Sequence, residues 1–245
     1  MTTAVKMVAI LATLPASLAG LGSHATPRGE RAANPVARSV HKEATRILNS
    51  IKKTEYKHST EIDEKKGVYY CDCSGLVGYV LNRTVGQDGS GALGDGRKRP
   101  LAMDYEKHFA KAPTKPARKS VERWQRVERL ADARPGDVIA WRHEVPKPGN
   151  TGHVVIVDQR PVLEDDGLVR VVYIDSTTLH QADDTRPDGI TGVGRGTMWF
   201  RVDDQGWAVA HIRGVRTAEA KTEAISIGRA LPVGKKPASR RAAGS

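Results

Sequence analysis

Cysteine is scarce in this sequence, and that limits what can stabilise the protein. Cys71 and Cys73 are the two cysteines among 245 residues, and a disulfide between residues two apart would be strained. This excludes the disulfide framework that supports many small exported domains. At least one thiol is then expected to serve chemistry, the alternative being two inert cysteines in the core.

Aromatic residues are also few, at 5% of the chain, whereas basic residues exceed acidic ones and give a net charge of +11. A surface with this charge attracts polyanions such as an anionic cell envelope. The basic residues are spread along the chain without the interleaved aromatics that single-strand binding uses. We therefore expect no nucleic acid among the partners.

Long apolar runs are missing except at the N-terminus. Lys6 precedes an apolar stretch over residues 7–21, and small residues follow. This layout is typical of a secretory signal peptide cleaved after Ala19 or Ala25, with an uncleaved membrane anchor as the alternative. No other segment is apolar enough to cross a bilayer, so we expect a secreted or periplasmic protein without stable membrane insertion after cleavage.

The remaining length suits one folded domain. We predict a signal peptide over residues 1–25, a linker over 26–35, a catalytic domain over 36–214 and a basic, disordered tail over 215–245. The oligomeric state is not indicated by any pattern in the sequence.

Helical spacing of apolar residues appears in the first half of this domain. It covers residues 36–51, the stretch after Cys73 and, more weakly, residues 103–111. Residues 82–118, rich in Gly, Lys and Arg, are expected to form a long surface loop that faces the substrate.

The second half of the domain has the pattern of strands. Turn sequences separate apolar stretches at a spacing that favours antiparallel hairpins. The predicted strands are residues 121–130, 137–141, 153–159, 168–174, 196–202 and 207–213. Helices followed by strands predict an α+β fold in which N-terminal helices pack on a curled antiparallel sheet.

Cys73 stands where a predicted helix begins, and a helix N-terminus favours the thiolate form. Asp72 and Ser74 are N-capping residue types, and the small Ser74-Gly75 pair lets a carbonyl approach the backbone N–H groups, which are candidate oxyanion donors. Cys71 lies before the helix and is expected to be structural, with a redox or metal role for the pair as the alternative. Further ligands at short spacing are lacking, so we expect no metal site.

His153 is the candidate base among eight histidines. Gly152 precedes it, and an apolar run over residues 154–157 makes it the first residue of a buried strand. An imidazole fixed at the edge of a sheet suits a general base. The alternative is a histidine that is simply part of the core.

Asp175 ends the apolar run of the next predicted strand, VRVVYIDST. If residues 153–159 and 168–175 pair as a hairpin, Asp175 returns beside His153 and can hold the imidazole tautomer. The alternative is an ordinary strand-end aspartate that forms a turn with Ser176 or Thr177.

Three motifs in this order, CDCSGLVGYVL, RPGDVIAWR and GHVVIVD, resemble the NlpC-type cell-wall peptidases, a papain-like family of bacterial cysteine hydrolases. The resemblance covers residues 56–176. It implies that Cys73 is the nucleophile, that His153 is the base and that Asp175, on the next strand, completes a triad. It also implies that the Pro-Gly-Asp turn at residues 135–137 is structural.

The family carries a tyrosine upstream of the cysteine that helps to line the oxyanion site. Tyr56 is the match, and Tyr69 and Tyr70 compete for this role. Three departures from the family stand out. The third triad residue is usually His, Asn or Gln, whereas here it is Asp175, and Val155 replaces a common glycine. The stretch over residues 82–126 is also longer than is usual in the family.

The resemblance implies hydrolysis of amide bonds in peptidoglycan stem peptides, commonly between a D-glutamyl residue and a diamino acid, through a thioester and without a cofactor. Peptidoglycan peptides or anionic cell-envelope polymers are the expected partners. One alternative is a papain-like amidase or acyltransferase that uses the same triad on another substrate. The other is a non-catalytic envelope-binding protein whose basic surface grips anionic polymers.

Overall fold

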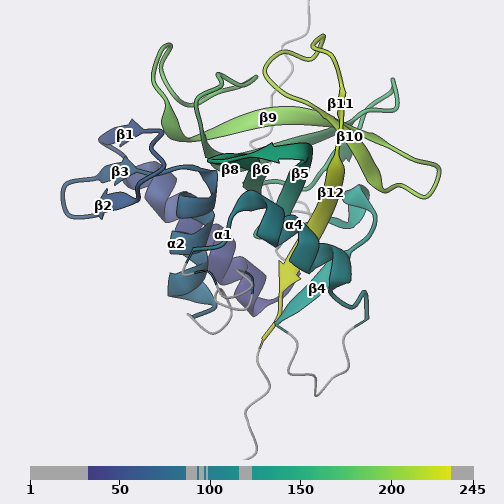
Figure 1. Cartoon of the computed structure of the whole chain (residues 1–245), viewed down its shortest axis with the longest axis horizontal. Helices are drawn as coiled ribbons and strands as arrows, with labels where there is room; N and C mark the ends of the chain where they lie inside the picture. Colours follow the sequence, from purple (N-terminus) through teal and green to yellow (C-terminus); the bar gives the residue numbers. More distant parts are fainter. Residues whose placement is uncertain (1–32, 87–92, 94–96, 98, 116–122, 233–245) are drawn as a thin grey trace, which may run out of the picture.

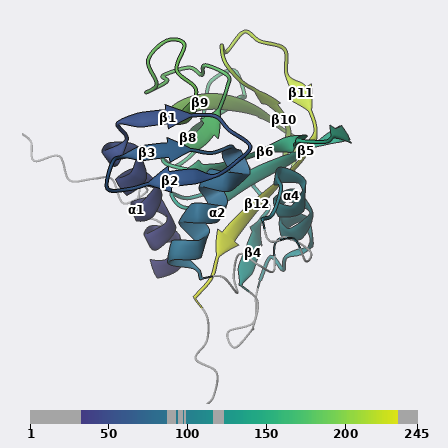
Figure 2. The same cartoon turned by 60° about the vertical axis from the view of Figure 1, so that its left-hand side comes forward.

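The computed structural model describes residues 33–86, 93, 97, 99–115 and 123–232 of the chain. The predicted signal peptide and linker up to residue 32 lie outside these residues. The described part is a mixed α+β fold with three α-helices on one side of a large antiparallel sheet and a small sheet beside them (Figures 1 and 2). Within it, no helix is long and apolar enough to span a membrane.

The elements are α1 (Pro35–Ser50), β1 (Lys53–Glu55), β2 (Glu61–Asp63), β3 (Val68–Tyr70), α2 (Cys73–Thr84), α4 (Ala102–Lys111), β4 (Trp124–Val127), η2 (Leu130–Asp132), β5 (Val138–Lys147), β6 (Asn150–Val157), β7 (Val162–Leu163), β8 (Val169–Thr177), β9 (Gly192–Val202), β10 (Ala208–Ile212), β11 (Lys221–Thr222) and β12 (Ala224–Ala230).

The large sheet has nine strands in the order β11-β10-β9-β8-β6-β5-β12-β4, with β7 beside β8. Antiparallel pairing of β6 with β8 matches the pairing that the sequence predicted, with Ile156 opposite Ile174 and Val157 opposite Tyr173. The sheet is an open path rather than the expected curled one, because its edge strands β11 and β4 do not pair with each other. The small sheet has the order β1-β3-β2.

Both faces of the central strands are buried, which explains their continuous apolar runs. On β6, Val154 and Ile156 pack in the core beneath the helices, whereas Val155 and Val157 belong to a second core on the opposite face. This second core includes Trp141 of β5 and side chains from β8, β9 and β12. The alternation of side chains therefore decides which core each site residue joins.

The predicted tail from residue 215 onward needs correction, because it contains two strands. β12 lies between β5 and β4, where Ile227 pairs with Ile139 on one side and Val127 on the other. Arg229 of the same strand binds the buried Asp137 carboxylate. Residues 233–245 lie outside the described part.

The expected surface loop over residues 82–118 also contains a core element. Tyr105 and Phe109 of α4 are fully buried, and α4 packs on β5, β6 and β12. Gly228 of β12 lies beneath Phe109, where an added Cβ would stand 2.3 Å from the ring. The apolar side of this short helix therefore belongs to the protein interior.

Candidate active site

The first turn of α2 presents Cys73, and Asp72 is its N-cap. Asp72 has extended backbone angles, and its Oδ1 accepts hydrogen bonds from the Gly75 N–H at 2.7 Å and from the Ser74 hydroxyl at 3.0 Å. These bonds satisfy Gly75 and fix the direction of the turn. The N–H groups of Cys73 and Ser74 have no acceptor within the helix, because the first residues of a helix lack one.

Two basic side chains contact the capping carboxylate. Arg99 binds Asp72 with both Nη atoms, at 2.9 and 3.0 Å, and His58 Nδ1 lies 3.4 Å from Asp72 Oδ2. A two-point arginine–carboxylate pair is geometrically specific. Arg99 therefore anchors its segment directly beside the candidate nucleophile.

The Cys73 side chain is buried, with 5% of its surface exposed. Burial raises the pKa of its thiol to about 12, and the Asp72 charge adds to the rise. The backbone N–H of Val154 donates to the sulfur and acts in the opposite direction. Cys73 is thus a neutral thiol at rest. Its backbone donor, Val154, directly follows His153 in the chain.

The imidazole of His153 is held by Asp175. Its Nε2 lies 2.7 Å from Asp175 Oδ2, and both side chains are buried. An ionised carboxylate can only accept, so Nε2 is the donor and Nδ1 of the neutral ring carries the lone pair. No hydrogen bond joins Cys73 to His153 among the described residues.

Helix α2 packs on β6 and β8, two strands whose pairing is short. In the part of the chain that the structure describes, the β6–β8 ladder pairs residues 156 and 157 alone, so the start of β6 and the end of β8 diverge. The His153 ring contacts Trp141 of the second core, with ring centroids 5.1 Å apart. Cys73 packs in the core beneath the helices, where the Ser176 hydroxyl donates to the Cys71 carbonyl at 2.6 Å.

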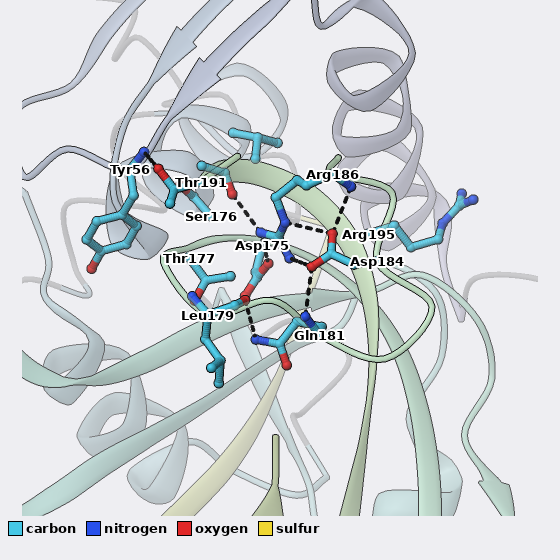
Figure 3. A network of polar contacts seen from close by, with 12 residues as sticks. Tyr56, Asp175, Ser176, Thr177, Leu179, Gln181, Asp184, Arg186, Thr191 and Arg195 are labelled. Carbon is cyan, nitrogen blue, oxygen red and sulfur yellow. Dashed lines mark hydrogen bonds and ion pairs between the residues drawn. The ribbon is translucent and has the colours of Figure 1, made fainter. Parts of the chain in front are cut away.

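Two arginines lie beside Asp175. Arg186 Nη1 donates to Asp175 Oδ1 at 3.1 Å, and Arg186 is itself buried (Figure 3). Arg213 Nη2 donates to Thr177 Oγ1 at 2.9 Å and lies 3.4 Å from His153 Nε2. The negative charge of Asp175 is therefore shared between the imidazole and two guanidinium groups.

This environment keeps the imidazole neutral. Burial, followed by the Arg213 charge, lowers the pKa of His153 to about 4, against the opposing effect of Asp175. Burial alone would raise the pKa of Asp175, but the hydrogen bond from His153 and the charges of Arg186 and Arg213 leave this pKa lowered overall. At rest the site thus holds a thiol, a neutral imidazole and a carboxylate.

A cavity of about 90 Å³ opens beside Cys73, and Tyr56 is the tyrosine of the three candidates that lines it. Tyr69 instead bonds Ser50 in the core, and Tyr70 lies under the Lys57 ammonium. Burial raises the pKa of Tyr56, so its phenol stays protonated and can donate. The lining residues are Tyr56, His58, Asp72, Cys73, Ser74, Arg99, Leu101, Ala102, Gly149, Thr151 and Gly152.

Cys71 is fully buried, and burial raises the pKa of its thiol to about 12. This environment fits a structural cysteine. Within the described residues, no group of three or more His, Cys, Asp or Glu side chains is arranged to hold a metal ion.

The three arginines of this site were not predicted from the sequence. Arg99, Arg186 and Arg213 come from loops, where a single basic residue has no periodic context. One sequence signal was available for Arg186. Glycines alternate at Gly192, Gly194 and Gly196 on β9, and glycine within a strand often marks the close approach of another group.

No protein-family model matches this sequence, and no curated protein matches it. Among solved structures, the wild-type endolysin LysIME-EF1 aligns with a TM-score of 0.35 and 16% sequence identity. The alignment covers 73% of this chain and 66% of that chain, just under two thirds of its length. A likeness at this level identifies neither family nor function, so the proposals below depend on the motifs and on the site geometry.

Proposed function

We propose that this protein is an exported, papain-like cysteine hydrolase of the NlpC type that cleaves amide bonds in peptidoglycan stem peptides. One observation carries the proposal. The Asp175 carboxylate holds His153 through Nε2, which leaves Nδ1 of the imidazole as the base. Val154, the residue after His153, donates its backbone N–H to the Cys73 thiol. These contacts support a thiol hydrolase in which Cys73 is the nucleophile, His153 the base and Asp175 the orienting carboxylate.

The nucleophile forms by proton transfer within the site. Burial disfavours the thiolate of Cys73 and the imidazolium of His153 when either is charged alone. Transfer of the thiol proton to Nδ1 creates both charges together, and their attraction in a site of low dielectric offsets part of the cost. Asp175 stabilises the imidazolium, as the third member of such a triad does.

Acyl transfer follows in two stages. The thiolate attacks the amide carbonyl, and the N–H groups of Cys73 and Ser74 with the Tyr56 hydroxyl are the proposed donors to the oxyanion. His153 then gives its proton to the leaving amine, and a thioester remains on Cys73. The same imidazole activates water, which releases the acyl group and restores the thiol. The Ser74 hydroxyl itself is engaged by Asp72, so Ser74 acts through its backbone.

The substrate assignment rests on the three motifs and on charge. A net charge of +11 favours association with an anionic envelope, and the N-terminal pattern favours export to it. Peptidoglycan peptides, which carry free carboxylates, are therefore the proposed partners.

The test is incubation of the purified chain with peptidoglycan fragments and identification of the products by mass spectrometry. Cleavage should disappear in Cys73→Ala and His153→Ala and persist in Cys71→Ala, which removes the other buried thiol. Release of intact peptides from the glycan would indicate an amidase, and a new amide formed with an added amine would indicate an acyltransferase. Retention on cell walls by wild type and Cys73→Ala alike, without cleavage, would contradict a hydrolase and support a binding protein.

A further inference from the structure

A buried ion pair lies one step beyond the proposed triad. Arg186 and Asp184 belong to the loop that joins β8 to β9, and their side chains are 2% and 0% exposed. Arg186 donates through Nε and Nη2 to the two oxygens of Asp184, at 2.8 and 2.9 Å. A two-point pair of this kind holds the guanidinium plane in one orientation.

The remaining donor group of Arg186 faces the strands. Nη1 donates to Asp175 Oδ1 at 3.1 Å (Figure 3). It also donates to the Gly192 carbonyl at 2.7 Å. Asp175 Oδ2 lies 2.7 Å from His153 Nε2. Each carboxylate oxygen of Asp175 thus has its own donor, and the two donors come from different parts of the chain. Such a carboxylate cannot rotate without losing a buried hydrogen bond.

The glycines of β9 make room for this arrangement. Gly194 pairs directly with Asp175 in the ladder, and a Cβ added to it would lie 2.8 Å from the Cγ and Nε atoms of Arg186. A Cβ on Gly196 would lie 2.7 Å from Gln181, at the start of the same loop. Arg186 therefore lies flat on a strand surface without side chains, and this is the route by which it reaches Asp175.

The same loop also contacts the other side of the site. The Thr191 hydroxyl accepts a hydrogen bond from the Tyr56 N–H at 3.1 Å (Figure 3). The segment between β8 and β9 is thereby tied to Asp175 through Arg186 and to the backbone of Tyr56 through Thr191. Asp175 and Tyr56, two of the proposed site residues, are therefore both positioned by this one loop.

We propose that Arg186, held by Asp184 over the glycines of β9, is a positioning residue that fixes Asp175 in the orientation in which it holds the His153 imidazole. The inference rests on the proposed function, in which His153 is the base. Arg186 makes no contact with the cavity at Cys73 and acts through Asp175. Removing it frees Oδ1 and leaves the charge of Asp175 to His153 and Arg213.

The test compares Arg186→Met, Arg186→Lys and Asp184→Asn with wild type. Arg195→Met is the matched control, because Arg195 lies on β9 beside the same loop and pairs with Asp158 instead of Asp175. Two readouts need no substrate: titration of the His153 ring by NMR, and the rate at which iodoacetamide alkylates Cys73. The ratio of kcat to KM on peptidoglycan fragments is the third.

In Arg186→Met the titration midpoint of His153 is expected to rise by about one pH unit, because a cation that competes for Asp175 is gone. Alkylation at pH 7 and kcat/KM should nevertheless fall about tenfold, mainly in kcat, because an imidazole no longer held in one orientation accepts the Cys73 proton less often; the loss of an outer-shell partner in metal sites has an effect of this size. Arg186→Lys keeps the charge but loses the two-point guanidinium geometry, so it should shift the His153 midpoint less. Arg195→Met should match wild type.

A folded Arg186→Met protein with an unchanged His153 midpoint would overturn the inference, and so would an equal shift in Arg195→Met. If Arg186→Met does not fold, Arg186→Lys and Asp184→Asn decide, and an unshifted midpoint in both overturns it. If the His153 midpoint shifts in Arg186→Met but the wild-type protein cleaves no peptidoglycan, the proposed function is refuted and the positioning role of Arg186 is not.

Discussion

At the scale of single residues, Cys73 experiences opposing influences. The helix N-terminus and the Val154 N–H favour its thiolate, whereas burial and the Asp72 carboxylate disfavour it. Asp72 nevertheless caps the helix that presents the thiol. One side chain therefore stabilises the local structure and suppresses reactivity at rest, and Arg99 offsets part of its charge.

Asp72→Asn is expected to lower the pKa of Cys73, because it removes the negative charge but keeps an oxygen to cap α2. The pH dependence of Cys73 alkylation measures this shift. Asp72→Ala should lower the pKa as well and also reduce the free energy of unfolding by about 1 kcal/mol, the usual cost of a lost cap. A midpoint in Asp72→Asn equal to or above that of wild type would contradict the account.

The neutral, buried His153 predicts acid sensitivity. Its pKa is about 4 in the folded protein and near 6.5 when unfolded, so the unfolded chain binds more protons below pH 6.5. This contribution to stability is present above pH 6.5 and is lost as the pH falls to 4, by up to about 1.4 kcal/mol per unit. Urea unfolding between pH 4 and 8 measures it.

His153→Gln should weaken this pH dependence without abolishing it, because burial also lowers the pKa of His211. An equally steep loss of stability in His153→Gln and wild type would show that His153 is not the group responsible.

At the scale of elements, the Pro-Gly-Asp turn before β5 packs directly on α1 and positions the sheet relative to that helix. Gly136 has φ +88°, and an added Cβ would lie 1.9 Å from the Ala37 carbonyl oxygen. Asp137, next in the turn, is fully buried and accepts hydrogen bonds from the Arg134 N–H and from Arg229. The turn thus joins α1, β5 and β12 at one point.

Gly136→Ala is expected to reduce the free energy of unfolding by about 3 kcal/mol or more, because strain at positive φ adds to a clash with backbone. Gly167→Ala is the matched control. It has φ +82° with open space around the added carbon, so about 1 kcal/mol is expected. Chemical denaturation of both variants gives the comparison, and equal losses would exclude the clash as the cause.

At the scale of the whole molecule, the C-terminal segment completes the domain. β12 separates β5 from β4 and contributes Ile227 and Ala230 to the two cores. Arg229 neutralises Asp137, which would otherwise be a buried charge without this partner. The domain boundary predicted at residue 214 therefore leaves out β12, which is an interior strand of the sheet.

A chain that ends at residue 214 should fail to form a cooperative fold, whereas one that ends at Pro232 should unfold cooperatively. Circular dichroism during thermal unfolding and size-exclusion chromatography distinguish the two. A monomeric shorter chain with the same unfolding midpoint would show that β12 is dispensable.

The sequence by itself determined the features that depend on neighbouring residues. The Asp72 cap, the helix that begins at Cys73 and the pairing of β6 with β8 all follow from local periodicity and turn residues. That pairing also explains why Asp175 was expected beside His153, since the two strands are close along the chain. The catalytic roles of these residues stay predictions.

The tertiary structure alone decided which distant segments complete the site. Arg186, Arg213 and Arg99 reach it from separate loops, α4 joins the core, and β12 enters the sheet between strands far from it in sequence. A strand's own apolar pattern shows that it is buried but not which strands it lies between. An isolated arginine likewise gives no sign of its partner, because its charge pairs only once the whole chain has folded.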